Sequence, residues 1–189
     1  MPWPRHLTWI VLALMTLGVG WAQETHAPPA VPTEEHDFLR QFSGEWTAVG
    51  KGTDVAGKSV DMKGLEIDRL VLGDFWLFLI FQSQIPEQPF VGHGMIGYDP
   101  IRRKYVGTWV DSLSPYLGTL EGTADPKTRT LTLEMAGTNA VTGKPSHDRL
   151  VYRFQDPEHR SVERTTLEDP EHPRLILRLD STKNQLHSK

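Results

Sequence analysis

FVGHGMIGYDPIRRKYVGTWVD, Phe90 to Asp111, is the stretch that decides the fold, because it predicts an antiparallel hairpin. The pair Asp99-Pro100 divides it in two, and Asp followed by Pro favours a type I turn. Apolar residues and glycines alternate with other residues on both sides of this turn, as in strands with one buried face. We expect Tyr98 to lie opposite Tyr105 in the hairpin.

The same alternation continues into the next two segments and predicts a register for each of them. In this register Trp109 lies opposite Gly94 on one side and opposite Gly118 on the other. The following hairpin then places Leu120 opposite Leu133. These residues share one face of the sheet, which is largely apolar and is therefore expected to point inward.

Further alternating segments follow, and Asp-Pro pairs separate them. TLTLEM, LVYRF and RLILRL each place apolar side chains on one face, and Asp-Pro recurs at Asp125, Asp156 and Asp169. Strands joined by short turns predict an all-β, antiparallel up-and-down meander of about ten strands. Such a meander closes into a barrel, because closure removes the exposed sheet edges. The segment EEHDFLRQF, which follows Thr33, predicts one short amphipathic helix before the strands.

The residues GHGMIG, Gly92 to Gly97, match G-x-G-x-x-G, the glycine pattern of dinucleotide-binding turns. A pyrophosphate site needs a helix directly after the glycines, whereas an Asp-Pro turn and another strand follow here. The glycines therefore indicate a close approach or a bend within a strand. Inward glycines leave room inside the barrel, and two interpretations stay open. Aromatic rings, chiefly Trp109, fill that room, or a small ligand does.

Two segments depart from simple alternation. In SVDMKGLEI the apolar positions change parity at Gly64, which predicts a β-bulge there. In FWLFLIF, Phe75 to Phe81, both faces are apolar. One face can enter the barrel, and we expect the N-terminal helix to cover the other, with a partner chain as the alternative.

The first residues predict an exported protein. A short basic start precedes an apolar segment that ends in small residues, as in a secretory signal peptide. This segment, Leu7 to Ala22, has 16 residues, short of the roughly 20 that a membrane-spanning helix needs. We expect a signal peptide at 1–22, a proline-rich linker at 23–33, a barrel domain at 34–181 and a tail at 182–189. After signal cleavage we expect no membrane insertion and a periplasmic or extracellular location.

Composition excludes several kinds of site. The chain has no cysteine, which excludes disulfides, catalytic thiols and cysteine-metal sites. Its formal net charge is −4, with acids and bases interspersed. Since phosphate contacts need clustered Lys and Arg, nucleic acid is not expected as a partner. None of the eight histidines lies at metal-ligand spacing from another, so no metal site is expected.

GMIGYDPIRRKYVGTWVDS followed by LEGTADPKTRTLTL closely resembles a family of exported bacterial proteins of unknown function, DUF1579, over about Phe38 to Leu179. The opening FSGEWTAVGKG, Phe42 to Gly52, resembles the G-x-W start of the calycin barrels, the lipocalin-like group. The resemblance implies a calycin-like barrel in which a short helix closes one end and Trp46 packs on the barrel floor. It supplies no activity and no ligand. Some calycin relatives bind haem through a histidine, so haem is an alternative to the expected absence of a cofactor.

Two charged residues fall on the predicted inward face. Asp111 lies beside Trp109 at the expected barrel mouth, where it either orients a ligand or acts as a base, or caps the turn with the serines of SLSP. Arg164 lies opposite Tyr152, where a buried cation needs a ligand carboxylate or a protein acid. A register slip of one residue would instead turn Arg164 to solvent and Glu163 inward. The predicted ligand-binding residues are Phe90, Tyr98, Tyr105, Trp109, Asp111, Tyr116, Tyr152 and Arg164.

The sequence thus favours an exported barrel, monomeric or weakly dimeric, that binds a small apolar or amphipathic molecule. Two alternatives stay open. One is an enzyme of the same fold that uses Asp111 as an acid or base. The other is a protein-interaction module with an outward apolar face of Val91, Met95, Val106, Val110 and Leu117.

Overall fold

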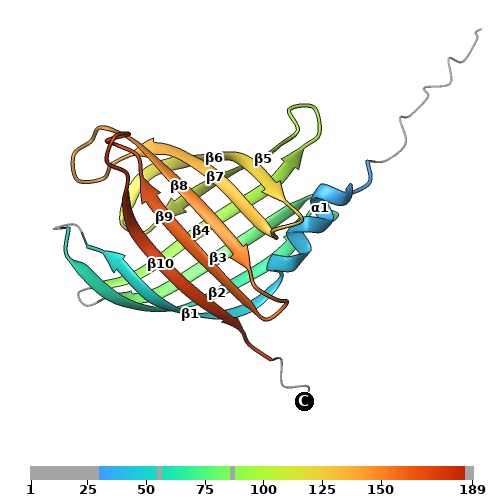
Figure 1. Cartoon of the computed structure of the whole chain (residues 1–189), viewed down its shortest axis with the longest axis horizontal. Helices are drawn as coiled ribbons and strands as arrows, with labels where there is room; N and C mark the ends of the chain where they lie inside the picture. The colour runs from blue at the N-terminus through green and yellow to red at the C-terminus, as the bar shows by residue number, and fades with distance from the viewer. Residues whose placement is uncertain (1–29, 55–56, 86–87, 186–189) are drawn as a thin grey trace, which may run out of the picture. The chain divides into compact units, whose positions relative to one another are not determined.

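The computed structural model describes residues 30–54, 57–85 and 88–185, which hold one α-helix, one 3-10 helix and ten strands (Figure 1). Helix α1, Glu34–Leu39, continues into the 3-10 helix η1, Arg40–Phe42. The strands are β1 Gly44–Thr53, β2 Ser59–Val71, β3 Trp76–Ile85, β4 Gln88–Asp99, β5 Lys104–Asp111, β6 Ser114–Asp125, β7 Thr130–Thr138, β8 Pro145–Phe154, β9 His159–Thr166 and β10 Arg174–Lys183. The predicted signal peptide and most of the predicted linker lie outside the described residues.

The strands form a closed barrel in which each strand pairs antiparallel with its neighbours in sequence. Strand β1 also pairs with β10, and this pairing closes the sheet. The structure therefore confirms the predicted up-and-down meander. Strand β10 runs to Lys183, two residues past the predicted domain boundary at 181. None of the described helices has the length and apolar character that crossing a membrane requires.

The predicted register is correct around the central hairpin. Tyr98 pairs with Tyr105, and Trp109 lies between Gly94 on β4 and Gly118 on β6. The apolar face of these strands points into the barrel, as expected. Turn chemistry and alternation were sufficient here, because every strand in this region is joined to the next by a short connection.

The register of the next hairpin, β6 to β7, differs from the prediction by two residues. Leu120 pairs with Met135 and not with Leu133. The turn is the cause, since Asp125 accepts a hydrogen bond from the Lys127 amide and four residues stay outside the ladder. A shift of two residues keeps every side chain on its predicted face.

The N-terminal helix fills one end of the barrel (Figure 1). Phe38 and Phe42 are buried there, and the Phe42 carbonyl accepts a hydrogen bond from Trp46 Nε1 at 2.7 Å. The Tyr105 hydroxyl donates to the carbonyl of Glu35 at 2.8 Å. The expectation that the helix covers the outer face of β3 is therefore wrong. The helix instead buries its own rings together with the inward rings of the barrel end, which would otherwise face water.

The segment Phe75–Phe81 alternates between the two faces of the barrel wall. Leu77, Leu79 and Phe81 point inward and are buried, while Trp76, Phe78 and Ile80 point outward and are half-buried. A Cβ atom at Gly97 would lie 2.6 Å from the Trp76 ring, so this indole packs on the neighbouring glycine. The outer side chains are thus partly covered by the barrel's own surface.

Strand β2 runs without the predicted bulge at Gly64. Its pairing with β1 is continuous, so alternation is maintained along the whole strand. Glu66 and Asp68 consequently point inward and are buried, while Leu65 and Ile67 point outward. A Cβ atom at Gly64 would lie 2.6 Å from the Phe81 ring, and glycine therefore makes room for this ring. Two carboxylates enter the barrel as a result.

Candidate ligand cavity

A cavity of about 800 Å³ lies inside the barrel, between the helix-filled end and the loops at the opposite end. We call the helix-filled end of this cavity the floor. At the opposite end the cavity reaches loop residues that include Leu113, Asn139 and Glu168. Its apolar wall includes Leu79, Ile96, Leu120, Leu133, Val162 and Leu179. The size falls within the range of about 300–1,000 Å³ that is typical of small-molecule sites.

Trp109 covers the inward glycines without filling the barrel. A Cβ atom at Gly92 would overlap Cζ2 of the indole, and one at Gly94 would lie 3.1 Å from Cε3. The ring therefore lies over both glycines on β4. The cavity remains beside it, and Trp109 is part of its wall. The two interpretations of the inward glycines are therefore compatible. The Trp109 ring occupies the space next to the glycines, and the barrel still contains open volume.

Asp111 faces the cavity, but its carboxylate serves the local turn. Oδ1 accepts a hydrogen bond from the Leu113 amide at 3.0 Å, and Oδ2 accepts one from Trp109 Nε1 at 3.1 Å. The geometry therefore supports the turn-capping interpretation, with Leu113 in place of the two serines as the capped residue. No hydrogen bond joins Asp111 to a second titratable group among the described residues. Acid–base catalysis by Asp111 gains no support from this arrangement.

Arg164 points inward from β9 and has an acid of the protein as its partner. Its Nε donates to Oδ2 of Asp148 at 2.8 Å, and its Nη2 contacts the same oxygen. The side chain of Asp148 is 4% exposed and that of Arg164 is 33% exposed, and both line the cavity. Arg164 pairs with Leu150 across the ladder and not with Tyr152. This shift of two residues preserves its inward direction, so the one-residue slip does not occur.

Three charged side chains are buried together at the floor. Arg160 Nη2 lies 2.7 Å from Oε2 of Glu66, and its Nη1 lies 2.8 Å from Oδ2 of Asp68. The guanidinium also stacks on Trp46, with Cζ 4.2 Å from the ring centroid. Trp46 is fully buried at the floor, the place that the calycin resemblance implied. The sequence analysis identified none of these three charged residues, because the change of parity at Gly64 predicted a bulge and not a continuous strand with inward acids.

One guanidinium facing two carboxylates leaves an unbalanced negative charge among buried side chains. Burial raises the pKa of the Asp68 carboxyl well above its usual value, and the charge of Glu66 raises it further, against the lowering effect of Arg160. The floor therefore favours a proton on Asp68. Glu66 and Arg160 then remain as an ion pair, and Glu66 also lines the cavity.

Tyr152 adds a phenol to the same end of the cavity. Its ring packs edge-on against Phe42, with the ring centroids 5.2 Å apart. The residue is 7% exposed and lines the cavity. Burial raises the pKa of its phenol, and the carboxylate of Glu66 raises it further. The hydroxyl therefore stays protonated and is available as a hydrogen-bond donor.

Six of the eight predicted ligand-binding residues line the cavity, namely Phe90, Trp109, Asp111, Tyr116, Tyr152 and Arg164. Tyr98 and Tyr105 are absent from its wall. Their rings pack on each other with centroids 5.2 Å apart, and Tyr105 bonds to the helix backbone. These two rings do point inward as predicted, but the helix occupies the barrel at their level. They therefore support the helix instead of the cavity.

The described histidines make structural contacts outside the cavity. His36 is buried in α1, where its Nδ1 accepts a hydrogen bond from the Thr33 amide at 3.0 Å. Three others, His147, His159 and His172, each contact an acid on the outside of the barrel. No described histidine lines the cavity. Within the described part of the chain, no three or more potential metal ligands gather into one group.

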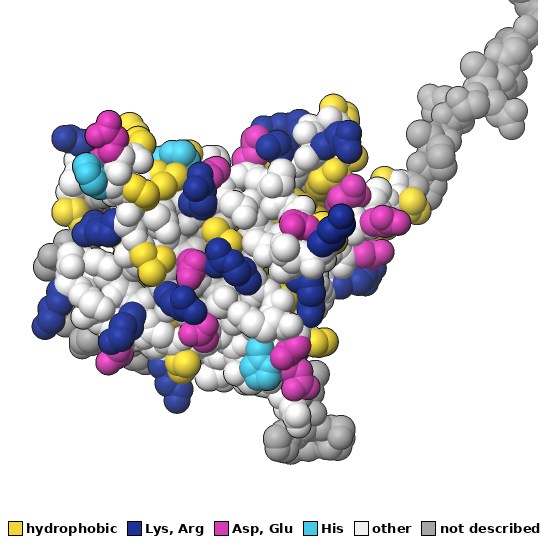
Figure 2. All heavy atoms as spheres, viewed as in Figure 1, with side chains coloured by type: hydrophobic (Ala, Val, Ile, Leu, Met, Phe, Trp, Pro, Cys, Tyr) yellow, Lys and Arg dark blue, Asp and Glu magenta, His cyan; other side chains and the backbone are white. Residues whose placement is uncertain are grey.

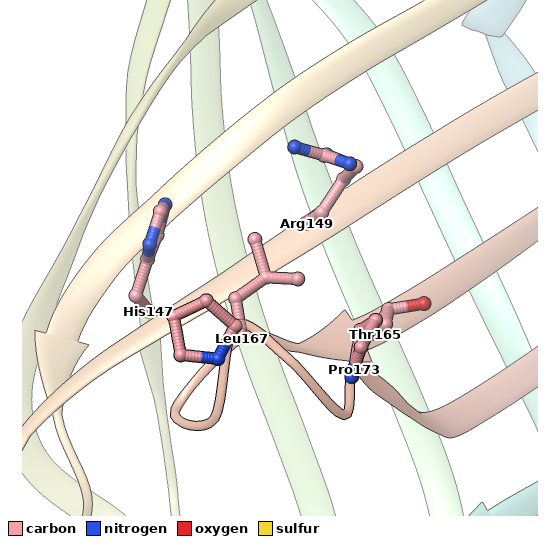
Figure 3. Close-up of a pocket in the computed structure, with 6 residues that line it drawn as sticks. His147, Arg149, Thr165, Leu167 and Pro173 are labelled. Atoms are coloured by element: carbon pink, nitrogen blue, oxygen red, sulfur yellow. The ribbon is translucent and has the colours of Figure 1, made fainter.

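A second hollow, of about 440 Å³, lies on the outside of the barrel next to the connection between β9 and β10 (Figure 3). His147 and Arg149 project from β8 beside Leu167 of this connection. Both polar side chains already contact Glu134 on β7, at 3.0 Å and 2.6 Å respectively. The Leu167 amide donates to the His147 carbonyl at 2.8 Å. Because its polar groups are satisfied and solvent reaches it, we take the interior cavity as the candidate site.

The outer surface carries mixed charges. Figure 2 shows Lys and Arg side chains interspersed with Asp and Glu over the face in view. Glu163, for example, contacts both Arg153 and Arg178 outside the barrel. Within the predicted interaction face, Val110 and Leu117 are 45% and 56% exposed, while its other three members are half-buried. That face therefore presents two exposed aliphatic side chains instead of a continuous exposed patch, and one of them, Leu117, also lines the cavity.

Comparison with known proteins agrees with the barrel. Rv2717c from M. tuberculosis has a TM-score of 0.63 and 14% identity, over 82% of this chain and 100% of that one. The S-type phycobiliprotein lyase CPES from Guillardia theta has a TM-score of 0.53 and 12% identity, over 82% of this chain and 94% of that one. At these identities the likeness shows the fold alone, a calycin-like barrel. The search among curated proteins found no match. The sequence profile of DUF1579, a family of proteins of unknown function, matches residues 31–183. The chain therefore belongs to the DUF1579 family.

Proposed function

We propose that this protein binds a small apolar or amphipathic molecule inside its barrel. The observation that carries the proposal is the cavity of about 800 Å³, which ten strands surround and apolar side chains largely line. Moving an apolar ligand from water into such a space is favourable by roughly 25 cal/mol for each Å² of buried apolar surface. A few polar groups on the wall are enough to fix its orientation.

We also propose that binding takes place outside the cytoplasm. The apolar segment Leu7 to Ala22 has the layout of a secretory signal peptide, and this layout supports the proposal. N-terminal sequencing of the protein from its own host is expected to begin near Gln23. A mature chain that retains Leu7 to Ala22 would contradict export by cleavage.

Neighbouring substitutions on β8 test the cavity directly. Leu150 lines the cavity, whereas the next residue, Val151, points to the outer surface. Leu150→Trp places a large ring in the cavity, and Val151→Trp places the same ring outside it. We expect wild type and Val151→Trp to bind the neutral fluorophore N-phenyl-1-naphthylamine with enhanced emission. Leu150→Trp should bind it at least about tenfold more weakly, a loss of about 1.4 kcal/mol.

Two outcomes would count against the proposal. Wild-type protein that shows no saturable binding of the fluorophore would remove its basis. Equal affinity in Leu150→Trp and Val151→Trp would place the bound fluorophore outside the barrel. Thermal unfolding of each variant shows whether it has the native fold, so that loss of binding is not confused with loss of structure.

A further inference from the structure

If the barrel binds a small molecule, as proposed above, the polar groups of the cavity decide which end of that molecule enters first. Three charged groups on the wall are already engaged: Asp111 with its turn, and Arg164 with Asp148. The two polar groups that face the cavity at the floor are the Glu66 carboxylate and the Tyr152 hydroxyl. What these two groups can bind therefore defines the polar end of a ligand.

The Tyr152 hydroxyl makes no hydrogen bond to another described residue, and it is open to the cavity. The residue is more than nine-tenths buried and lines the cavity, and its ring packs on Phe42. A molecule that fills the cavity buries this hydroxyl, and a buried hydroxyl without a hydrogen bond costs free energy, so binding favours a ligand group that accepts its proton. That group must be a hydrogen-bond acceptor.

Glu66 sets the second requirement. Arg160 contacts its Oε2 at 2.7 Å from behind, and the carboxylate still faces the cavity. An ionised carboxylate only accepts hydrogen bonds, so the ligand group beside it must be a donor. The charge of the whole cavity points the same way, because five acids but only two bases line it. A second anion placed at this floor would be repelled.

We propose that the floor binds the hydroxyl end of an apolar alcohol, with Glu66 accepting the ligand's proton and Tyr152 donating to the ligand's oxygen. A hydroxyl is both a donor and an acceptor and so matches both side chains. A carboxylate can accept from Tyr152 but faces the charge of Glu66. The ligand therefore enters polar end first, and its apolar body fills the space between the floor and Trp109.

A matched pair of probes tests this inference. Decanol and decanoate carry the same apolar chain and differ at the end that reaches the floor. Each probe is used to displace N-phenyl-1-naphthylamine from the wild-type protein at neutral pH. The concentration of each probe is kept below the value at which that probe aggregates in water. We expect decanol to bind at least about tenfold more tightly than decanoate, the range of one charge-assisted hydrogen bond.

Substitutions at the floor should remove this preference. Tyr152→Phe keeps the ring on Phe42 and should weaken decanol binding several-fold. Glu66→Gln removes the charge and should bring decanoate closer to decanol. The matched control is Glu121→Gln, which changes the same group outside the cavity, where Glu121 contacts Arg102 and its side chain is 46% exposed. This control should leave the preference as it is in the wild type.

The outcomes separate this inference from the proposed function. If neither probe displaces the fluorophore and the fluorophore itself does not bind, the proposed function fails, and this inference fails with it. If both probes bind and decanoate binds as tightly as decanol, the barrel is a ligand site but the assignment of an alcohol is wrong. An unchanged preference in Tyr152→Phe would overturn the role of the floor even if Glu66→Gln does not fold.

Discussion

Replacing Asp68 with asparagine should change how the stability of the barrel depends on pH. In the folded chain, burial and then Glu66 hold the pKa of Asp68 well above its usual value. In the unfolded chain the same carboxyl titrates at about 3.9. Between these two values the folded state binds one proton more than the unfolded state. The free energy of unfolding therefore falls as the pH rises through this window.

The steepness of this pH dependence follows from the single proton on Asp68. A difference of one bound proton changes the free energy of unfolding by about 1.4 kcal/mol for each pH unit. Asp68→Asn keeps the size of the side chain and removes its titration, and its amide can accept from Arg160 and donate to Glu66. We expect this variant to lose the downward slope and to be at least as stable as wild type at neutral pH.

Urea unfolding followed by tryptophan fluorescence, at pH values from about 5 to 8, measures this slope. Asp61→Asn is the control, because Asp61 lies on the same strand with its side chain 87% exposed. Its curve should run parallel to that of wild type. Parallel curves for wild type and Asp68→Asn would refute the assignment of a proton to the floor, and so would a marked loss of stability in Asp68→Asn at neutral pH.

Two further substitutions test the packing and pairing inside the barrel. Gly92→Ala should cost about 1–3 kcal/mol in urea unfolding, because its Cβ overlaps the Trp109 ring. Gly137→Ala, whose Cβ would meet nothing nearer than 3.5 Å, should cost little, and equal losses would contradict the packing of Trp109. Arg164→Met should cost about 3 kcal/mol by leaving buried Asp148 unpaired. Adding Asp148→Asn should restore most of that loss, and no recovery would argue against the pair.

Much of the fold can be predicted from local chemistry. Asp-Pro turns and alternation are enough to place Tyr98 opposite Tyr105 and Trp109 between two glycines, since neighbouring strands are joined by short connections. The two register errors, at Leu120 and Arg164, each amount to two residues. Alternation has a period of two, so it fixes the face of a side chain but not its exact partner.

The floor of the cavity shows where sequence reasoning stops. The apolar residues of β2 change parity at Gly64, and a bulge is the simplest local explanation. The strand in fact runs straight through, because Arg160 on β9 supplies a partner for Glu66 and Asp68 inside the barrel. No local pattern reveals this pairing, since the arginine lies far away in sequence. The packing of Tyr98 and Tyr105 beneath the helix likewise depends on tertiary contacts that no local pattern reveals.

Native mass spectrometry of the protein purified from its own host tests the ligand-binding barrel most directly. We expect the wild type to carry the mass of one small molecule in addition to its chain. Val151→Trp should carry the same added mass, and Leu150→Trp should lose it, because Leu150 lines the cavity and Val151 does not. A chain that carries no added mass in its wild-type form, or an added mass that survives Leu150→Trp, would contradict binding inside the barrel.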